Sequence, residues 1–212
     1  SSLSRAEGGV AKSRQGLAKS LILRNIMNVT ILLLFWKQRR DQFVESVIPY
    51  QWGVMNDEIA TEVPDDPAAI SLPIIKSHAV ENLRIAAGDE PVNFRQVFQD
   101  SDIYKWLEEA AYALIDHPDP QLRELCDETV DLIARAQQSD GYLDTPYQIK
   151  TGEWAHRERF TLIQQSHEMY VMGHYIEAAV AYHEVTGNQQ ALDVACRMAD
   201  CMMPISARRT AR

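Results

Sequence analysis

The sequence has 212 residues, 46% of them hydrophobic, which suffices for the core of one domain or at most two. Its net charge of −9 is unevenly distributed: residues 1–40 sum to +7 and residues 41–203 to −19. Because nucleic-acid binding requires clustered cations, the acidic body argues against a nucleic-acid partner and favours a neutral ligand. The most apolar run, residues 31–36 with flanks, reaches about nine residues against roughly 20 needed to cross a bilayer, so no membrane partner is expected.

Residues 1–34 are basic, and we expect them to be a disordered N-terminal segment. No small-residue cleavage site follows their short apolar part, so there is no clear signal peptide and the compartment stays open. The three cysteines, Cys126, Cys196 and Cys201, do not make a disulfide framework. No C-x-x-C motif occurs, so the sequence predicts no self-contained metal site.

The predicted elements that follow are helical. A short apolar stripe over residues 43–48 is expected to be interrupted at Pro49. Three prolines predict a surface loop over residues 61–75. Apolar periodicity then predicts four helices. They run from Asp102, with Asp102 or Ser101 as N-cap, to Asp116; from Gln121 to Gln138; from Gln164 to Glu184, ended by Gly187; and from Gln189 to about Met202.

These helices make two αα-hairpins with one long loop between them, and no strand pattern of comparable strength is present. The sequence therefore predicts an all-α fold. Repeated αα-hairpins are typical both of an α-solenoid and of a closed α/α toroid. The long aromatic loop over residues 139–159 favours a toroid with a carbohydrate-sized cleft.

The helix from Gln164 carries two histidines, His167 and His174, on one face. Seven residues separate them by about 10 Å along a helix, too far for one zinc ion whose ligands lie at about 2 Å. Two imidazoles two turns apart instead suit the polar wall of a cavity, because each offers one donor and one acceptor. The alternative is that both are hydrogen-bonded members of the core.

Two further segments are candidates for ligand contact. Tyr50-Gln51-Trp52 sets an amide between two aromatic rings, which suits either a sugar contact or a packed corner. The polar stretch over residues 150–159 contains Trp154 and His156, which are cavity-lining candidates from the composition of that loop alone.

Five motifs resemble, in order, the N-terminal part of the β-L-arabinofuranosidase-like glycoside hydrolases, family 127, over residues 35–203. They are Val47-Ile48-Pro49-Tyr50-Gln51-Trp52, Glu81-Asn82-Leu83-Arg84-Ile85-Ala86-Ala87-Gly88, Asp100-Ser101-Asp102-Ile103-Tyr104-Lys105-Trp106-Leu107-Glu108, Asp140-Gly141-Tyr142-Leu143, and His167-Glu168-Met169-Tyr170 with Gly173-His174 and Ile176-Glu177-Ala178.

The resemblance implies part of an (α/α)6 toroid that removes non-reducing terminal β-L-arabinofuranosyl units. It implies that Gln51 and His167 contact the sugar, a neutral furanoside or oligosaccharide. Glu168 and His174 belong to the same motif and are candidates for cavity lining or for a structural role.

The resemblance also implies a cysteine nucleophile, a glutamate acid/base, and a zinc ion held by cysteines and a glutamate. Nothing in this sequence matches those motifs, so the zinc ligands are expected beyond residue 212, with no cofactor in this chain. Residues 204–212 do not continue the family pattern. We therefore expect a truncated, inactive part of a toroid that self-associates through an exposed apolar surface. The alternative is a non-catalytic helical-hairpin module that binds carbohydrate or protein.

Overall fold

The computed structural model describes residues 34–60, 76–89, 99–149 and 157–210, with the backbone alone for residues 34 and 206–210. Its described part contains helices and no strand, as the sequence predicts. The chain divides into two compact units, Ser1–Asp41 and Gln42–Arg212, and each is described by itself. The predicted disordered segment and the predicted loop over residues 61–75 lie outside the described residues.

The described part of the first unit is α2 (Leu34–Gln42) without its last residue, a polar helix with exposed aromatic side chains. Lys37 Nζ lies 2.6 Å from Asp41 Oδ2, one turn further along the helix. The guanidinium of Arg39 lies 5.4 Å from the centre of the Phe35 ring. These contacts within one exposed helix contribute little, a few tenths of a kcal/mol for each ion pair.

The second unit begins with a π-helical turn, η1 (Phe43–Val47), followed directly by α3 (Ile48–Met55). The predicted interruption at Pro49 is therefore wrong. Pro49 lies just after the π-helical turn, and Val47 before it is itself helical, so the helix passes through the proline, which leaves one carbonyl of the preceding turn without a backbone donor. The Trp106 indole N–H donates to the Ile48 carbonyl over 3.1 Å, and the Trp52 and Trp106 rings lie 4.6 Å apart, so α3 is fastened to the helix that carries Trp106.

Next come α4 (Ala79–Ala87), α5 (Asp100–Asp116) and α6 (Pro120–Ala136). The Asp119 side chain caps α6 by accepting from the N–H groups of Gln121 and Leu122. The predicted cap of α5 by Ser101 or Asp102 is wrong, because the helix starts two residues earlier. Asp100, in its first turn, accepts instead from the backbone N–H and the hydroxyl of Thr145.

The chain continues through α7 (Thr145–Gln148), α8 (Ile163–Ser166), α9 (Glu168–Thr186) and α10 (Gln189–Thr210). The predicted single helix from Gln164 is thus two helices, because the chain breaks at His167, whose φ is +61°. Gly187 ends α9 with φ +74°, as predicted. The predicted end near Met202 is wrong: α10 continues to Thr210 with Pro204 inside it, although proline cannot donate to the carbonyl one turn earlier.

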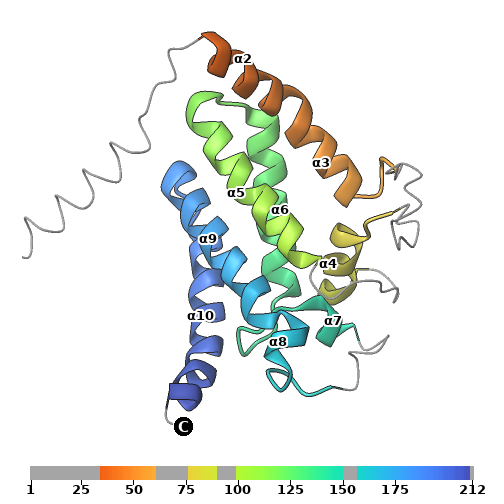
Figure 1. Ribbon diagram of the computed structural model, residues 1–212, viewed down its shortest axis with the longest axis vertical. Helices are drawn as coiled ribbons and strands as arrows, with labels where there is room; N and C mark the ends of the chain where they lie inside the picture. Colours follow the sequence, from red (N-terminus) through yellow and green to blue (C-terminus); the bar gives the residue numbers. More distant parts are fainter. Residues whose placement is uncertain (1–33, 61–75, 90–98, 150–156, 211–212) are drawn as a thin grey trace, which may run out of the picture. The chain divides into compact units, whose positions relative to one another are not determined.

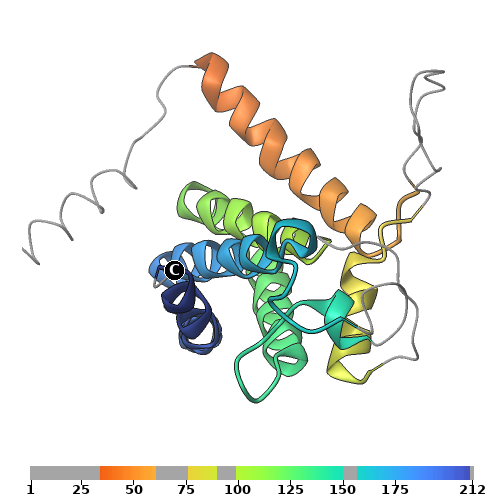
Figure 2. The ribbon, with the colours of Figure 1, turned by 60° about the horizontal axis from the view of Figure 1, so that its bottom comes forward.

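Figure 1 shows α5 and α9 side by side, and in the turned view of Figure 2 α6 and α10 lie below them as a second layer. The core between the layers is built from fully buried apolar side chains, among them Ile103, Leu107, Ile133, Val171 and Met172. The Tyr104 ring on α5 meets the Tyr175 ring on α9 edge to face, with centroids 5.1 Å apart. The two predicted hairpins therefore pack mainly through their first helices.

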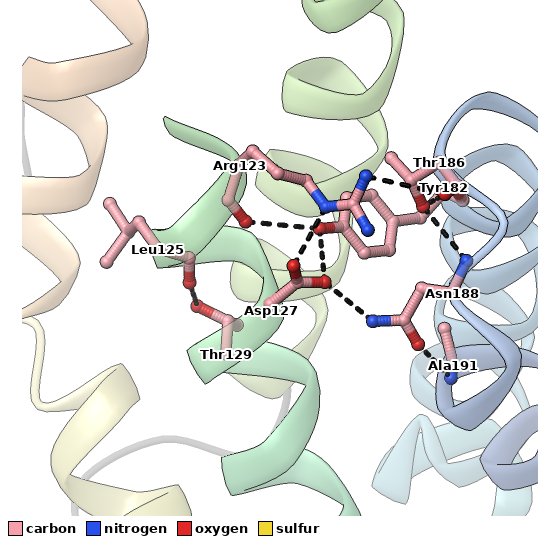
Figure 3. Close-up of polar contacts among 8 residues, drawn as sticks. All are labelled: Arg123, Leu125, Asp127, Thr129, Tyr182, Thr186, Asn188 and Ala191. Carbon is pink, nitrogen blue, oxygen red and sulfur yellow. Dashed lines mark hydrogen bonds and ion pairs between the residues drawn. The ribbon is translucent and has the colours of Figure 1, made fainter. Parts of the chain in front are cut away.

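A polar cluster joins α6 to the turn between α9 and α10 (Figure 3). The Asp127 carboxylate accepts from Arg123 Nε over 2.8 Å, from the Tyr182 hydroxyl over 2.8 Å and from Asn188 Nδ2 over 2.6 Å. Asn188 Oδ1 in turn accepts from the Ala191 N–H at the start of α10. Hydrogen bonds to a charged group are stronger than neutral ones, so this carboxylate links the second layer to the first.

Candidate functional site

Gln51 lies in a pocket between α3 and α5. The pocket has a volume of about 330 Å³ and is lined from α3 by Tyr50 and Gln51 and from α5 by Lys105, Trp106 and Glu109, among others. The Gln51 Oε1 is buried, and no group among the described residues donates a hydrogen bond to it. An unpaired buried acceptor costs about 1–3 kcal/mol, so this atom is suited to receive a hydroxyl from a ligand.

Glu109 stands beside Gln51 in the same pocket. Burial raises the pKa of the Glu109 carboxyl, and a hydrogen bond from Gln51 opposes this rise. The pocket therefore offers a carboxyl group and an amide oxygen next to the exposed Tyr50 ring. Few polar groups beside aromatic walls are typical of small-molecule sites.

A row of side chains extends from this pocket across α9. Lys105 Nζ donates to the Tyr170 hydroxyl over 2.7 Å. The Tyr170 ring lies between two histidines, with its centroid 6.1 Å from that of His167 and 4.4 Å from that of His174. Gln51 and His167 are not in contact, but Lys105 and Tyr170 connect them across α5 and α9.

His167 stands at the break between α8 and α9, with an exposed side chain. Its Nδ1 lies 2.9 Å from the Gln165 carbonyl. A left-handed conformation is uncommon for a residue with a side chain, and such conformations cluster at functional sites. The sequence predicts His167 inside a helix, whereas the structure places it immediately before one.

Glu168 takes the structural one of its two candidate roles. Its carboxylate is fully buried and accepts from the Phe160 N–H, from the Ser166 hydroxyl over 2.8 Å and from the Tyr142 hydroxyl over 2.7 Å. These bonds hold two preceding loops against the first turn of α9, which accounts for the break at His167. Both Glu168 oxygens are thus engaged by neighbouring residues, and Glu168 is not among the residues that line the Gln51 pocket.

His174 keeps one ring nitrogen inside the structure. Its Nδ1 is buried, and the Glu177 carboxylate lies 3.5 Å away, beyond good hydrogen-bond distance. The ring lies edge to face with Tyr170, one turn earlier. His174 thus supports the Tyr170 ring from within α9. Trp154 and His156 lie outside the described residues.

Two carboxyl groups are buried that the sequence did not predict to be so. Asp100 is fully buried, and burial is the main reason that its pKa is raised to about 6. Burial also raises the pKa of Asp144 well above its ordinary value, and the nearby Asp100 and Glu168 charges add to the effect. Neither Asp144 oxygen has a hydrogen-bond partner among the described residues. The motif Asp140-Gly141-Tyr142-Leu143 ends one residue before Asp144 and gave no sign that Asp144 is buried.

One group of possible metal ligands is present among the described residues: Asp57, His78 and Glu81, whose ligand atoms lie within 4.8 Å of one another. His78 Nδ1 is 3.0 Å from Asp57 Oδ2 and also contacts Glu81, so the contacts are those of ion pairs joining the turn after α3 to α4. No cysteine belongs to this group. Burial raises the pKa of Cys126 to about 12, so it remains a thiol. These residues do not fit a zinc–cysteine centre.

A larger cavity, of about 510 Å³, lies elsewhere, between α4 and α6. It is lined by charged side chains such as Arg84, Asp131 and Arg135, and of the candidate segment Tyr50-Gln51-Trp52 it contains only Trp52. Arg135 is already paired with Asp89 and Asp131. We therefore place the site at the smaller pocket, where the unpaired Gln51 oxygen lies.

Comparisons with known proteins agree with the motifs. A sequence model described as β-L-arabinofuranosidase, GH127 catalytic domain, matches residues 28–211. A non-reducing end β-L-arabinofuranosidase from Bifidobacterium longum subsp. longum is 76% identical over 177 residues, which are 83% of this chain and 27% of that protein.

Two solved structures are also similar. A GH127 β-L-arabinofuranosidase from Geobacillus stearothermophilus T6 has a TM-score of 0.71 and 45% identity, over 82% of this chain and 25% of that one. A GH127 β-arabinofuranosidase has a TM-score of 0.67 and 32% identity, over 83% and 26% respectively. The chain thus spans about a quarter of the length of these relatives.

The helical fold of the described residues and the match over residues 28–211 place the chain in a family of glycoside hydrolases. The chain belongs to the GH127 β-L-arabinofuranosidase catalytic-domain family. Its two packed αα-hairpins form part of an (α/α)6-type toroid. No helix among the described residues is long and apolar enough to cross a membrane.

Proposed function

We propose that this chain provides part of the sugar-binding surface of a non-reducing end β-L-arabinofuranosidase, with Gln51 and His167 contacting the terminal sugar. The observation that carries the proposal is the buried Gln51 Oε1, an acceptor without a donor inside a pocket. A sugar hydroxyl supplies such a donor, and the exposed His167 ring offers a second polar contact on the connected surface.

The charge of the molecule supports a neutral ligand. Residues 41–203 sum to −19, so they repel anions such as nucleic acid. The pocket itself contains Asp102 and Glu109 with one cation, Lys105. A furanoside brings hydroxyl groups and no charge, so it pairs with these groups without repulsion.

The 212-residue chain is proposed to bind this sugar without hydrolysing it. Retaining or inverting hydrolysis requires two groups poised on either side of the glycosidic bond. On α9, the carboxylate of Glu168 accepts hydrogen bonds from within the chain, and that of Glu177 is exposed. We expect no release of arabinose from methyl β-L-arabinofuranoside, measured by chromatography of the reaction mixture.

The binding proposal is tested by calorimetric titration of the chain with methyl β-L-arabinofuranoside. We expect weak binding that falls at least fivefold in Gln51→Ala and in His167→Ala. Gln42→Ala, an exposed glutamine outside the pocket, is the control and should leave affinity unchanged. Equal affinity in all four proteins would reject the assignment of Gln51 and His167.

A further inference from the structure

The pair formed by Lys105 and Tyr170 occupies the surface between the two proposed sugar contacts. Lys105 lines the Gln51 pocket from α5. Its ammonium reaches out of the pocket to the Tyr170 hydroxyl, 2.7 Å away, and lies 5.0 Å from the centre of the Tyr170 ring. Through these contacts and the His167 ring, 6.1 Å from the Tyr170 ring, the pair links the Gln51 pocket to His167.

The Tyr170 side chain is an exposed aromatic ring held in place. It is 45% exposed, although the other two tyrosines of α9, Tyr175 and Tyr182, are fully buried. The rings of His174, on the same helix, and His167, immediately before it, lie edge to face with the Tyr170 ring, and Lys105 holds its hydroxyl from α5. A ring fixed from several directions loses little conformational entropy when a ligand packs on it.

The Lys105 ammonium has more N–H donors than the described neighbouring residues fill with short hydrogen bonds. Its contacts are the Tyr170 hydroxyl at 2.7 Å, the Ser101 hydroxyl at 3.4 Å and the Asp102 carboxylate at 4.0 Å. Only the first is a short hydrogen bond, and an ammonium has three N–H groups. The ammonium can therefore donate to a ligand hydroxyl without leaving Tyr170.

We propose that Tyr170 and Lys105 are further sugar-contacting residues: the Tyr170 ring packs against the C–H face of the furanoside, and Lys105 donates a hydrogen bond to one of its hydroxyls. This inference rests on the proposed function and adds to it the surface on which the sugar lies. Apolar walls with a few placed donors are the usual composition of such sites.

The competing explanation is that the pair only braces α5 against α9. A brace would affect stability and not ligand affinity, so the two explanations differ in which measurement changes. Tyr170→Phe keeps the ring and removes the hydroxyl bonded to Lys105. Tyr170→Ala removes the ring, and Lys105→Met removes the ammonium while keeping the length of the side chain.

The experiment is a titration of the 212-residue chain and these variants with methyl β-L-arabinofuranoside, followed by NMR, with thermal melting of each protein. We expect Tyr170→Ala to weaken binding at least tenfold, Lys105→Met about fivefold and Tyr170→Phe less than threefold. The control is Tyr112→Ala, which removes an equally exposed tyrosine, 50% exposed, about 10 Å further along α5. Its affinity should equal that of the unmodified chain.

Three outcomes separate the proposals. Loss of affinity in Tyr170→Ala and Lys105→Met at nearly constant melting temperature supports the inference. If Gln51→Ala and His167→Ala weaken binding while Tyr170→Ala behaves like Tyr112→Ala, the inference is overturned and the proposed function stands. If the unmodified chain does not bind the furanoside, both are overturned.

Discussion

Single side chains in this protein divide sharply between structural and ligand-facing roles, and neighbours in sequence take opposite ones. Glu168 is fully buried and its carboxylate is occupied by donors from three residues, whereas His167, immediately before it, is exposed. Both belong to the motif His167-Glu168-Met169-Tyr170. The motif does not distinguish the roles of its residues. Here the difference in burial separates the buried Glu168 from the exposed His167.

Replacing Glu168 tests its structural role. A glutamine has one acceptor oxygen in place of two, so at least one of the bonds from Phe160, Ser166 or Tyr142 is lost. Bonds to a charged group are each worth about 1.5–3 kcal/mol, and we expect Glu168→Gln to lower the free energy of unfolding by about 2 kcal/mol. Urea denaturation measures this change.

The matched control is Glu184→Gln, which changes an exposed glutamate on the same helix and should shift stability by less than about 0.5 kcal/mol. Equal stability of Glu168→Gln and Glu184→Gln would show that the buried carboxylate is not needed to hold the loops before α9.

Between elements, the contact of Asp100 on α5 with Thr145 at the start of α7 depends on pH. The folded-state pKa of Asp100 is about 6, against 3.8 for an ordinary aspartate, mainly because of burial. The folded protein therefore binds this proton more tightly than the unfolded chain does. The stabilisation of the folded state by this bound proton is complete below pH 4 and is lost as the pH rises through 6.

The shift corresponds to a fall on the order of 3 kcal/mol in the free energy of unfolding between about pH 4 and 7. Asp144, whose pKa is also raised, acts in the same direction. We expect Asp100→Asn to flatten this pH dependence, measured by urea denaturation at several pH values. A variant that keeps the full slope would contradict the assignment to Asp100.

The sequence predicted the helices better than their ends. Apolar periodicity located α5, α6, α9 and α10, because a helix buried on one face must repeat its apolar residues. It could not show that Glu168 would bond backward to Phe160, or that Asp100 would bond to Thr145 and not cap its own helix. These errors share one cause: the partner lies far away in sequence or across a loop.

The candidate site was predictable only in part. Gln51 and His167 followed from the family resemblance and remain predictions, while Lys105 and Tyr170 lie inside the quoted motifs but were given no role there. Only the packing of α5 on α9 brings these two side chains within hydrogen-bond distance. A lysine and a tyrosine 65 positions apart are ordinary surface residues until the fold is known.

At the scale of the whole molecule, the chain is expected to self-associate. Exposed large apolar side chains in the second unit include Tyr50, Tyr112, Tyr170 and Val180, from α3, α5 and α9. Contiguous apolar surface promotes association. We expect the apparent mass in light scattering to rise above 24.1 kDa as the concentration increases. A constant mass of 24.1 kDa over the same range would contradict the expectation.

The most direct test of the sugar-binding surface is a map of backbone amide shifts during titration with methyl β-L-arabinofuranoside. The surface defined by Gln51, Lys105, Tyr170 and His167 predicts that the perturbed amides gather on α3, the first half of α5 and the first two turns of α9. Perturbations gathered instead around Arg84 and Arg135, at the larger cavity between α4 and α6, would contradict it.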